Sequence, residues 1–250
     1  MSEKTIRWLH LSDMHMGCPG KTDRDHMLQV FSGHVSRFAT QRGVPDLILI
    51  TGDIAWSGTE EQYREFDAFL LKLNQWLGVE AGLPGPVVVP VPGNHDLVWP
   101  SEAKLKRAFS ILVDIAAGQR AENLTELEEN LHDETNKGMF AELFKAYHAW
   151  LKRLIATNWN RPGELRHAQG EMPGDVCLHL NLPGRPSLAI VGLNSAWMQI
   201  AKGDYEKKLE MLPRQFLRLA GQDGALPLHE PALLLMHHPP EWLSEPGRAG

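Results

Sequence analysis

The stretch Pro86–Asp96 reads PVVVPVPGNHD and joins an apolar run directly to a polar cluster. Its valine-rich part, Pro86–Val91, is typical of a buried β-strand. Gly93 then lets the backbone turn sharply where a side chain would obstruct it. The next three residues, Asn94 to Asp96, carry an amide, an imidazole and a carboxylate. Since ligands of open α/β sheets bind beyond the carboxyl ends of the strands, we expect a functional site here.

Three other apolar runs end in polar clusters in the same way. They are Ile6–Leu11 before SDMH, Asp46–Thr51 before GD, and Ala232–Met236 before HHPP. We expect all four strand ends to meet. Asp13 and His15 lie two residues apart, and in an extended segment such residues point the same way, toward one cation. Carboxylate, imidazole and amide ligands suit Mn, Fe or Zn.

The periodicity between these strands predicts an α/β fold. Helical spacing of apolar residues runs through Asp25–Arg42 and Glu60–Leu77. Short buried strands that alternate with helices indicate βαβ units and a sheet covered on both faces. Residues 101–157 contain no strand candidate and read as two or three helices around the acidic run Glu122–Glu134. We interpret them as a helical insertion, which is either a solvated elaboration or a cap or docking surface.

Strands resume after the insertion. Val176–Leu182 and Leu188–Leu193 flank the turn-forming sequence PGRP and predict an antiparallel pair, in a mixed sheet or in a second sheet. Leu209–Leu219 is expected to be helical. Among single residues, we expect His10 in the core or beside a ligand, and Asn194 in a structural turn.

Composition excludes several other classes. Of the 250 residues, 25 are Lys or Arg and 31 are Asp or Glu, so the net charge is −6. Nucleic acid could still be a partner, but the net charge gives it no support. Two cysteines make neither a disulfide framework nor a cysteine zinc site. The N-terminus lacks an apolar run that is typical of a signal peptide, and no stretch is long enough to span a membrane. We therefore expect a cytoplasmic protein.

The order D-x-H, G-D, G-N-H-D and H-H-P-P, each at a strand end, resembles the calcineurin-like metallophosphoesterase family. The match runs over residues 6–240, apart from the insertion at 101–157. The resemblance implies a four-layer αββα sandwich of two mixed sheets flanked by helices, spanning residues 1–250. It also implies two divalent metal ions (Mn, Fe or Zn) between the strand ends.

The resemblance assigns roles by position. Asp13 and His15 would bind the first metal, Asp53 would bridge both, and Asn94 and His237 would bind the second. His95 would face the substrate as an acid or electrostatic stabiliser, and Asp96 would hold the His95 ring in its tautomer. His238 would lie behind a ligand or face the substrate. Trp56 and Trp99, beside these motifs, are expected to pack rather than to stack on a substrate.

The implied activity is metal-dependent hydrolysis of a phosphate ester. Two cations would acidify a water molecule, and the resulting metal-bound hydroxide would attack phosphorus. A phosphodiester of a nucleotide or nucleic acid is the first expectation. A phosphomonoesterase, a protein phosphatase and a non-catalytic metal-binding or assembly module are the alternatives.

One motif of the resembled family is missing. That family also carries Gly-His-x-His, which supplies a histidine to each metal, and no histidine follows His238 in this sequence. We therefore expect the domain over residues 1–250 to be incomplete at its C-terminus. A downstream segment or a partner chain would then complete the site.

Overall fold

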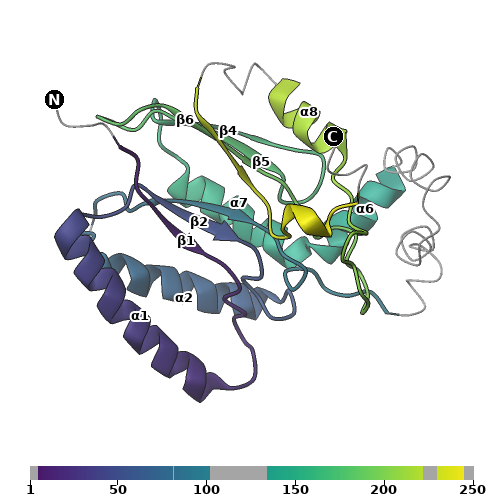
Figure 1. The fold of residues 1–250 in the computed structure, drawn as a ribbon, viewed down its shortest axis with the longest axis horizontal. Coiled ribbons are helices and arrows are strands. Elements are labelled where there is room, and N and C mark those ends of the chain that lie inside the picture. The colour runs from purple at the N-terminus through teal and green to yellow at the C-terminus, as the bar shows by residue number, and fades with distance from the viewer. Residues whose placement is uncertain (1–4, 81, 102–133, 222–229, 245–250) are drawn as a thin grey trace.

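The computed structural model describes residues 5–80, 82–101, 134–221 and 230–244. They form two sheets that face each other (Figure 1). The first sheet has the order β1-β2-β3, and its described strands are all parallel. Its strands are β1 (Trp8–Leu11), β2 (Leu47–Thr51) and β3 (Val87–Val91). These bounds agree with the predicted strands to within two residues.

The second sheet has the order β4-β5-β6-β7 and is mixed. Its strands are β4 (Leu165–Gln169), β5 (Val176–Leu180), β6 (Leu188–Gly192) and β7 (Ala232–Leu235). The β5–β6 pair is antiparallel, as the PGRP turn predicts, whereas β6 and β7 are parallel. β4 was not predicted. Its sequence LRHAQ is largely polar and lacks an apolar run typical of a buried strand, and most of the strand is exposed.

Helices cover the outer faces of the sandwich. α1 (Lys21–Arg42) and α2 (Glu60–Trp76) lie against the first sheet, and α8 (Pro213–Gly221) lies over β5 of the second (Figure 1). The predicted helix over Leu209–Leu219 begins later, because Pro213 suits the first turn of a helix. The α/β sandwich expected from the resemblance is therefore confirmed.

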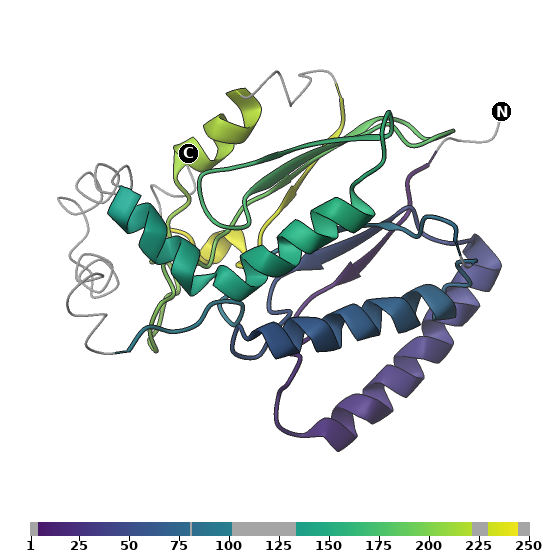
Figure 2. The same ribbon diagram turned by 180° about the vertical axis from the view of Figure 1, so that it is seen from behind.

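Two helices are described within the predicted insertion. They are α6 (Glu134–Leu143) and α7 (Lys145–Asn158). α7 runs alongside α2 and contacts β3 (Figure 2), and its buried side chains belong to the main core. α7 is thus part of the packed domain and not a solvated elaboration, whereas a role of the segment as a cap or docking surface stays a prediction. The acidic run lies almost entirely outside the described residues, and the domain limits stay a prediction.

The main core lies between the sheets and under α2 and α7. β2 and β3 are almost wholly buried, as their unbroken apolar sequences require. β1 differs from the buried strand that its sequence suggests, because it is an edge strand and leaves Trp8 48% exposed. Trp150 joins α7 to α2: its ring stacks on Tyr63 at 5.5 Å between centroids, and its Nε1–H donates to Asp67 Oδ1 at 2.7 Å. Among the described residues, no helix is long and apolar enough to cross a membrane.

We predict that Trp150→Ala lowers the free energy of unfolding by about 3–5 kcal/mol, because it leaves a large cavity between α2 and α7 and removes the hydrogen bond to Asp67. The measurement is urea denaturation followed by circular dichroism. Trp8→Ala is the matched control, since half of that ring is already in solvent, and it should cost less than about 1 kcal/mol. Equal losses in the two variants would contradict this description of the core.

Candidate metal centre

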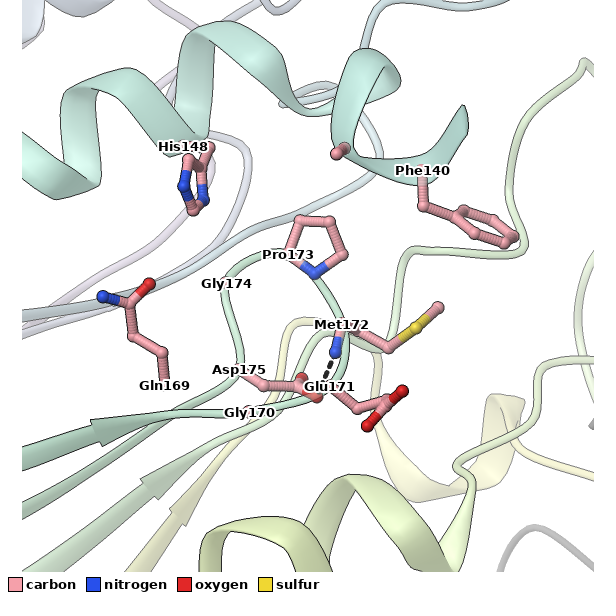
Figure 3. A pocket seen from close by; sticks show the side chains of 10 residues that line it. Phe140, His148, Gln169, Gly170, Glu171, Met172, Pro173, Gly174 and Asp175 are labelled. Atoms are coloured by element: carbon pink, nitrogen blue, oxygen red, sulfur yellow. Dashed lines mark hydrogen bonds between the residues drawn. The ribbon is translucent and has the colours of Figure 1, made fainter. Parts of the chain in front are cut away.

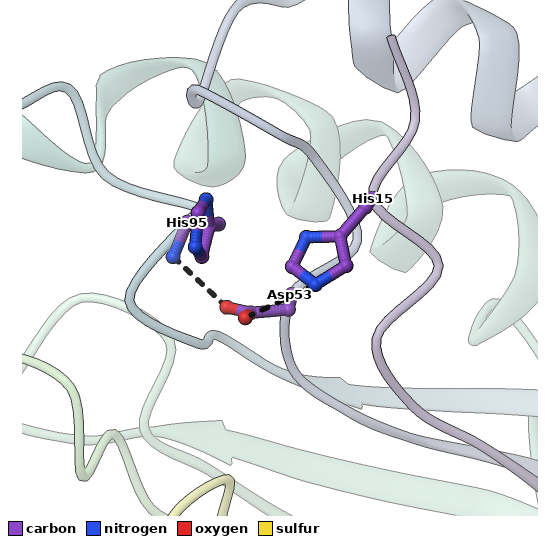
Figure 4. A group of neighbouring side chains, drawn as sticks. All are labelled: His15, Asp53 and His95. Carbon is purple, nitrogen blue, oxygen red and sulfur yellow. Dashed lines mark hydrogen bonds and ion pairs between the residues drawn. The ribbon is translucent and has the colours of Figure 1, made fainter. Parts of the chain in front are cut away.

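The loops after β1 and β2 run side by side beyond the sheet. The backbone N–H of Asp13 donates to the Gly52 carbonyl at 3.2 Å, and that of His15 donates to the Asp53 carbonyl at 2.9 Å. The loop after β3 joins them, because the His95 N–H donates to Asp53 Oδ1 at 2.9 Å (Figure 4). The structure thus brings the three polar clusters to one edge of the first sheet.

His237 enters this cluster from the second sheet. Its Nε2 lies 3.2 Å from Asn94 Oδ1 and 3.6 Å from Asp53 Oδ2. Its Nδ1 lies 2.8 Å from the Thr51 carbonyl, which can only accept a hydrogen bond. Nδ1 must therefore carry the proton in the neutral ring, which leaves a lone pair on Nε2. Nε2 and two oxygens face one another, as they would around a shared cation.

His15 lies on the other side of Asp53. Its Nε2 is 3.8 Å from both Asp53 Oδ2 and Asp13 Oδ1. Its buried Nδ1 has no hydrogen-bond partner within the described residues. Burial lowers the pKa of His15, although Asp53 and Asp13 act in the opposite direction. A neutral imidazole whose Nε2 faces two carboxylates fits a cation as ligand.

These side chains form two groups that could each hold a metal ion, and Asp53 belongs to both. One group is His15, Asp53 and His95, and the other is Asp13, Asp53 and His237. Within each group the ligand atoms lie within 4.8 Å of one another. Figure 4 shows the first group, with Asp53 below the two imidazole rings. The chemistry of both donor sets fits divalent metals that accept nitrogen and oxygen ligands.

The backbone of the centre adopts a conformation that side chains usually avoid. Asp13, His15 and Asp53 have φ values of 56°, 43° and 54°, in the left-handed region. The extended geometry that the sequence analysis assumed for Asp13 and His15 is therefore wrong: a left-handed turn, not strand alternation, directs them to one place. Such residues cost of order 1–3 kcal/mol each and concentrate at functional sites.

Two glycines make room for the centre. Gly52 has φ of 86°, and a Cβ there would lie 2.5 Å from His237 Nδ1 and 2.8 Å from the Gly93 nitrogen. A Cβ on Gly93 would collide with the carboxylate and the backbone nitrogen of Asp53. Neither position tolerates a side chain, so both loops can approach only as glycine.

Trp56 holds the ring of His95. Its carbonyl lies 2.7 Å from His95 Nδ1, and its indole stacks on the imidazole at 4.9 Å between centroids. The edge of the same indole meets His15 at 5.3 Å. The carbonyl sets the tautomer of His95, which directs Nε2 away from the loop. This contact could not be predicted from the sequence, because every residue type has the same backbone carbonyl.

Asp96 does not contact the His95 ring, so the role predicted for it is wrong. The Asp96 carboxylate is fully buried and accepts the backbone N–H groups of Ile54, Ala55 and Gly93 at 2.9–3.2 Å. It also accepts the Tyr63 hydroxyl at 2.8 Å. Burial raises the pKa of Asp96 to about 6, although the backbone hydrogen bonds act to lower it. Asp96 therefore fastens the β2 and β3 loops together instead of orienting His95.

His238 does not face the centre, so a substrate contact is wrong and a supporting position remains. The residue is 4% exposed, its Nδ1 lies 3.0 Å from Ser195 Oγ, and its Nε2 lies 2.9 Å from Gln199 Oε1. Burial, and then the neighbouring His237, lower the pKa of His238 to about 3. The neutral ring ties the loop after β6 to the segment that carries His237.

The structure agrees with some of the remaining expectations and contradicts others. Asn194 lies in a structural turn, as predicted: its amide group bonds to the Pro173 carbonyl and the Ala196 N–H. His10 is exposed and lies 2.8 Å from Thr51 Oγ1, so the core position expected for it is wrong. The reason is that β1 is an edge strand. Trp56 and Trp99 are each 39% exposed, and the expectation that they pack rather than stack on a substrate stays a prediction.

A separate cavity of about 220 Å³ lies between α6, α7 and the loop after β4 (Figure 3). It is lined by Phe140, His148, Glu171 and neighbouring residues, and none of the predicted ligands contributes to it. Asp175 at its wall already accepts the Met172 and Asn194 N–H groups. The cavity is therefore not part of the candidate centre.

Comparison with known proteins adds one finding. A family model described as calcineurin-like phosphoesterase matches residues 6–248. No individual curated protein matches the chain. The matched range includes all four strand ends of the candidate centre.

We predict that Gly52→Ala disrupts the centre, because its Cβ would displace His237 and the Gly93 backbone. Metal affinity, measured by calorimetric titration with Mn²⁺, should fall at least about 10-fold. This is the lower end of the loss that is typical when the orientation of metal ligands is disturbed. Gly163→Ala is the matched control, with φ of 81° and no atom within 4 Å of the added Cβ. It should cost only the roughly 1–2 kcal/mol of left-handed backbone strain and leave metal affinity unchanged. Equal metal affinities in the two variants would contradict the crowding at Gly52.

Proposed function

Because the chain belongs to the calcineurin-like phosphoesterase family, a family of hydrolases, we propose that it is a metal-dependent phosphodiesterase that acts on a nucleotide-like substrate. The observation that carries the proposal is the Asp53 carboxylate, which is shared by two groups of potential metal ligands. A carboxylate shared by two nitrogen- and oxygen-rich groups could contact both of the closely spaced cations that two-metal hydrolysis uses.

We propose that Asp13 and His15, whose Oδ1 and Nε2 lie 3.8 Å apart, hold one divalent cation. Asn94 and His237, whose Oδ1 and Nε2 lie 3.2 Å apart, would hold another, and Asp53 would contact both. This pairing differs from the two groups of side chains described above, in which Asp13 lies with His237 and His15 lies with His95. Mn, Fe and Zn suit these ligands. When bound, the cations would lower the pKa of a water molecule and offset charge on the phosphate oxygens. The side chain of Asp13 is 57% exposed, so the centre is open on that side. Water, or donors from outside the described residues, would fill the positions that remain.

His95 is the proposed acid. Hydrolysis forms one P–O bond to water and breaks the P–O bond to the leaving group, which then needs a proton. With Nδ1 held by the Trp56 carbonyl, a protonated His95 would donate from Nε2 and return to its neutral tautomer. The same geometry permits His95 to act as a metal ligand, since its ring belongs to one of the two groups. Substitution distinguishes these two roles.

We predict that Asp53→Asn removes hydrolysis of bis(p-nitrophenyl) phosphate and lowers bound metal. The amide loses the charge that would offset two cations, so metal affinity should fall more than about 100-fold. The measurements are metal content by mass spectrometry after dialysis and release of p-nitrophenol with Mn²⁺. Asp204→Asn, in an exposed loop, is the control and should change neither. Full metal content in Asp53→Asn would refute the bridging assignment.

We predict that His95→Ala keeps its metal but lowers kcat on the same diester by about 10²–10⁴-fold, the usual contribution of an acid or base. Metal content and kcat must be measured on the same preparation. A metal loss as large as that of Asp53→Asn would make His95 a ligand. Comparison of the diester with p-nitrophenyl phosphate tests the substrate class, because a monoesterase would prefer the second compound.

A further inference from the structure

A groove adjoins the candidate metal centre on the side of Trp99. It has a volume of about 380 Å³ and lies between the segment 98–101, the start of α2 and the junction of α6 with α7. Trp99, Glu60, Glu142 and Lys145 are among its lining residues. Its size is that of a site for a small molecule.

Trp99 connects this groove to the centre. Its indole Nε1–H donates to the carbonyl of Asn94, a proposed ligand, at 3.4 Å. The other side of the segment is anchored, because Leu97 is 1% exposed and the Val98 N–H donates to the Leu143 carbonyl at 2.9 Å. The groove is therefore preformed, and the segment 94–99 links it to the centre.

Trp99 is partly exposed where it lines the groove. Its exposed fraction of 39% equals that of Trp56 and is below the 48% of Trp8 on β1, and its neighbour Val98 is 49% exposed. An indole that is rigidly placed and partly in solvent offers a flat surface on which a planar ring can stack. The position of Trp99 in the groove, not its exposed fraction, distinguishes it from Trp8.

The charges of the groove restrict what can follow that ring. Glu60 and Glu142 contribute carboxylates, and Lys145 is already 3.4 Å from Glu142. These carboxylates can accept hydrogen bonds from the amino and hydroxyl groups of a nucleoside. They oppose a second phosphate, and the net charge of −6 adds no attraction for a polyanion.

We propose that this groove binds the nucleoside of a substrate whose single phosphodiester lies at the metal centre, and that Trp99 is the stacking residue. This inference rests on the proposed function and narrows the substrate from nucleotide-like esters in general to esters with one nucleoside per phosphate. We expect nucleic-acid strands, which would place a further phosphate in the groove, to bind poorly.

The first test needs no catalysis. Binding of adenosine to the metal-free chain is measured by saturation-transfer NMR titration for the wild type, Trp99→Leu and Trp8→Leu. Since base stacking on an aromatic side chain contributes strongly, Trp99→Leu should weaken binding about 10-fold or more, and Trp8→Leu, an exposed tryptophan on β1, should not. Absence of adenosine binding in the wild type, or equal binding in all three proteins, overturns the proposal.

The second test uses hydrolysis with Mn²⁺. The ratio of kcat/KM for the p-nitrophenyl ester of thymidine 5′-phosphate to that for methyl p-nitrophenyl phosphate should fall about 10-fold in Trp99→Leu, mainly through KM. Trp99→Phe, which keeps a flat ring, should recover most of the ratio and also serves if the leucine variant is unstable. An unchanged ratio overturns the proposal.

The two tests separate the two hypotheses. If neither ester is hydrolysed but adenosine binding depends on Trp99, the proposed function fails and the groove assignment stands. If both esters are hydrolysed but adenosine does not bind, the proposed function stands and the groove assignment fails. The restriction of the substrate to one nucleoside per phosphate is tested by competition. It would be overturned if octathymidylate displaced adenosine as strongly as thymidine 5′-phosphate does.

Discussion

The position of the Asp53 carboxylate constrains everything around it. Asp53 is 3% exposed, and its Oδ1 accepts the His95 N–H while Oδ2 faces His15 and His237 at 3.8 and 3.6 Å. A buried carboxylate with so few donors is unfavourable in water-poor surroundings. Cations on either side would offset that cost, and the surrounding loops are shaped so that this oxygen pair stays between two groups of ligands.

The shape of those loops explains why glycine and left-handed backbone occur together here. Gly52 and Gly93 permit the β2 and β3 loops to approach until Asp53, Gly93 and His237 nearly touch. Asp13, His15 and Asp53 then complete their turns at positive φ. Each of these features is unfavourable alone, and the hydrogen bonds between the loops hold them in place.

Sequence patterns predicted the part of this centre that depends on strand ends. Apolar runs such as Leu47–Thr51 and Val87–Val91 can be read as buried strands, and the polar residues after them must lie at one edge of the sheet. The family match to residues 6–248 agrees with that interpretation. β4 escaped prediction because an exposed, polar strand has no apolar period to detect.

Contacts made by backbone atoms could not be predicted in the same way. The carbonyls of Thr51 and Trp56 set the tautomers of His237 and His95, and any residue type would supply the same oxygen. The role of Asp96 was predicted wrongly for a related reason. Asp96 follows His95 in the sequence, but its buried carboxylate accepts hydrogen bonds from N–H groups of both loops. Spacing shows which side chains are near one another, not which donors they meet.

Asp96 stabilises the loops of the centre independently of the proposed metal ligands. Asp96 joins the loops after β2 and β3 through three backbone N–H groups and the Tyr63 hydroxyl, all buried. None of these contacts involves a proposed metal ligand, so Asp96 still joins the two loops when the hydrogen bond from the His95 N–H to Asp53 Oδ1 is lost. A centre built this way is preorganised: cations bind to groups already in place, and ligand substitutions remove affinity for metal without removing the fold. That separation makes metal content and folding independent measurements in this protein.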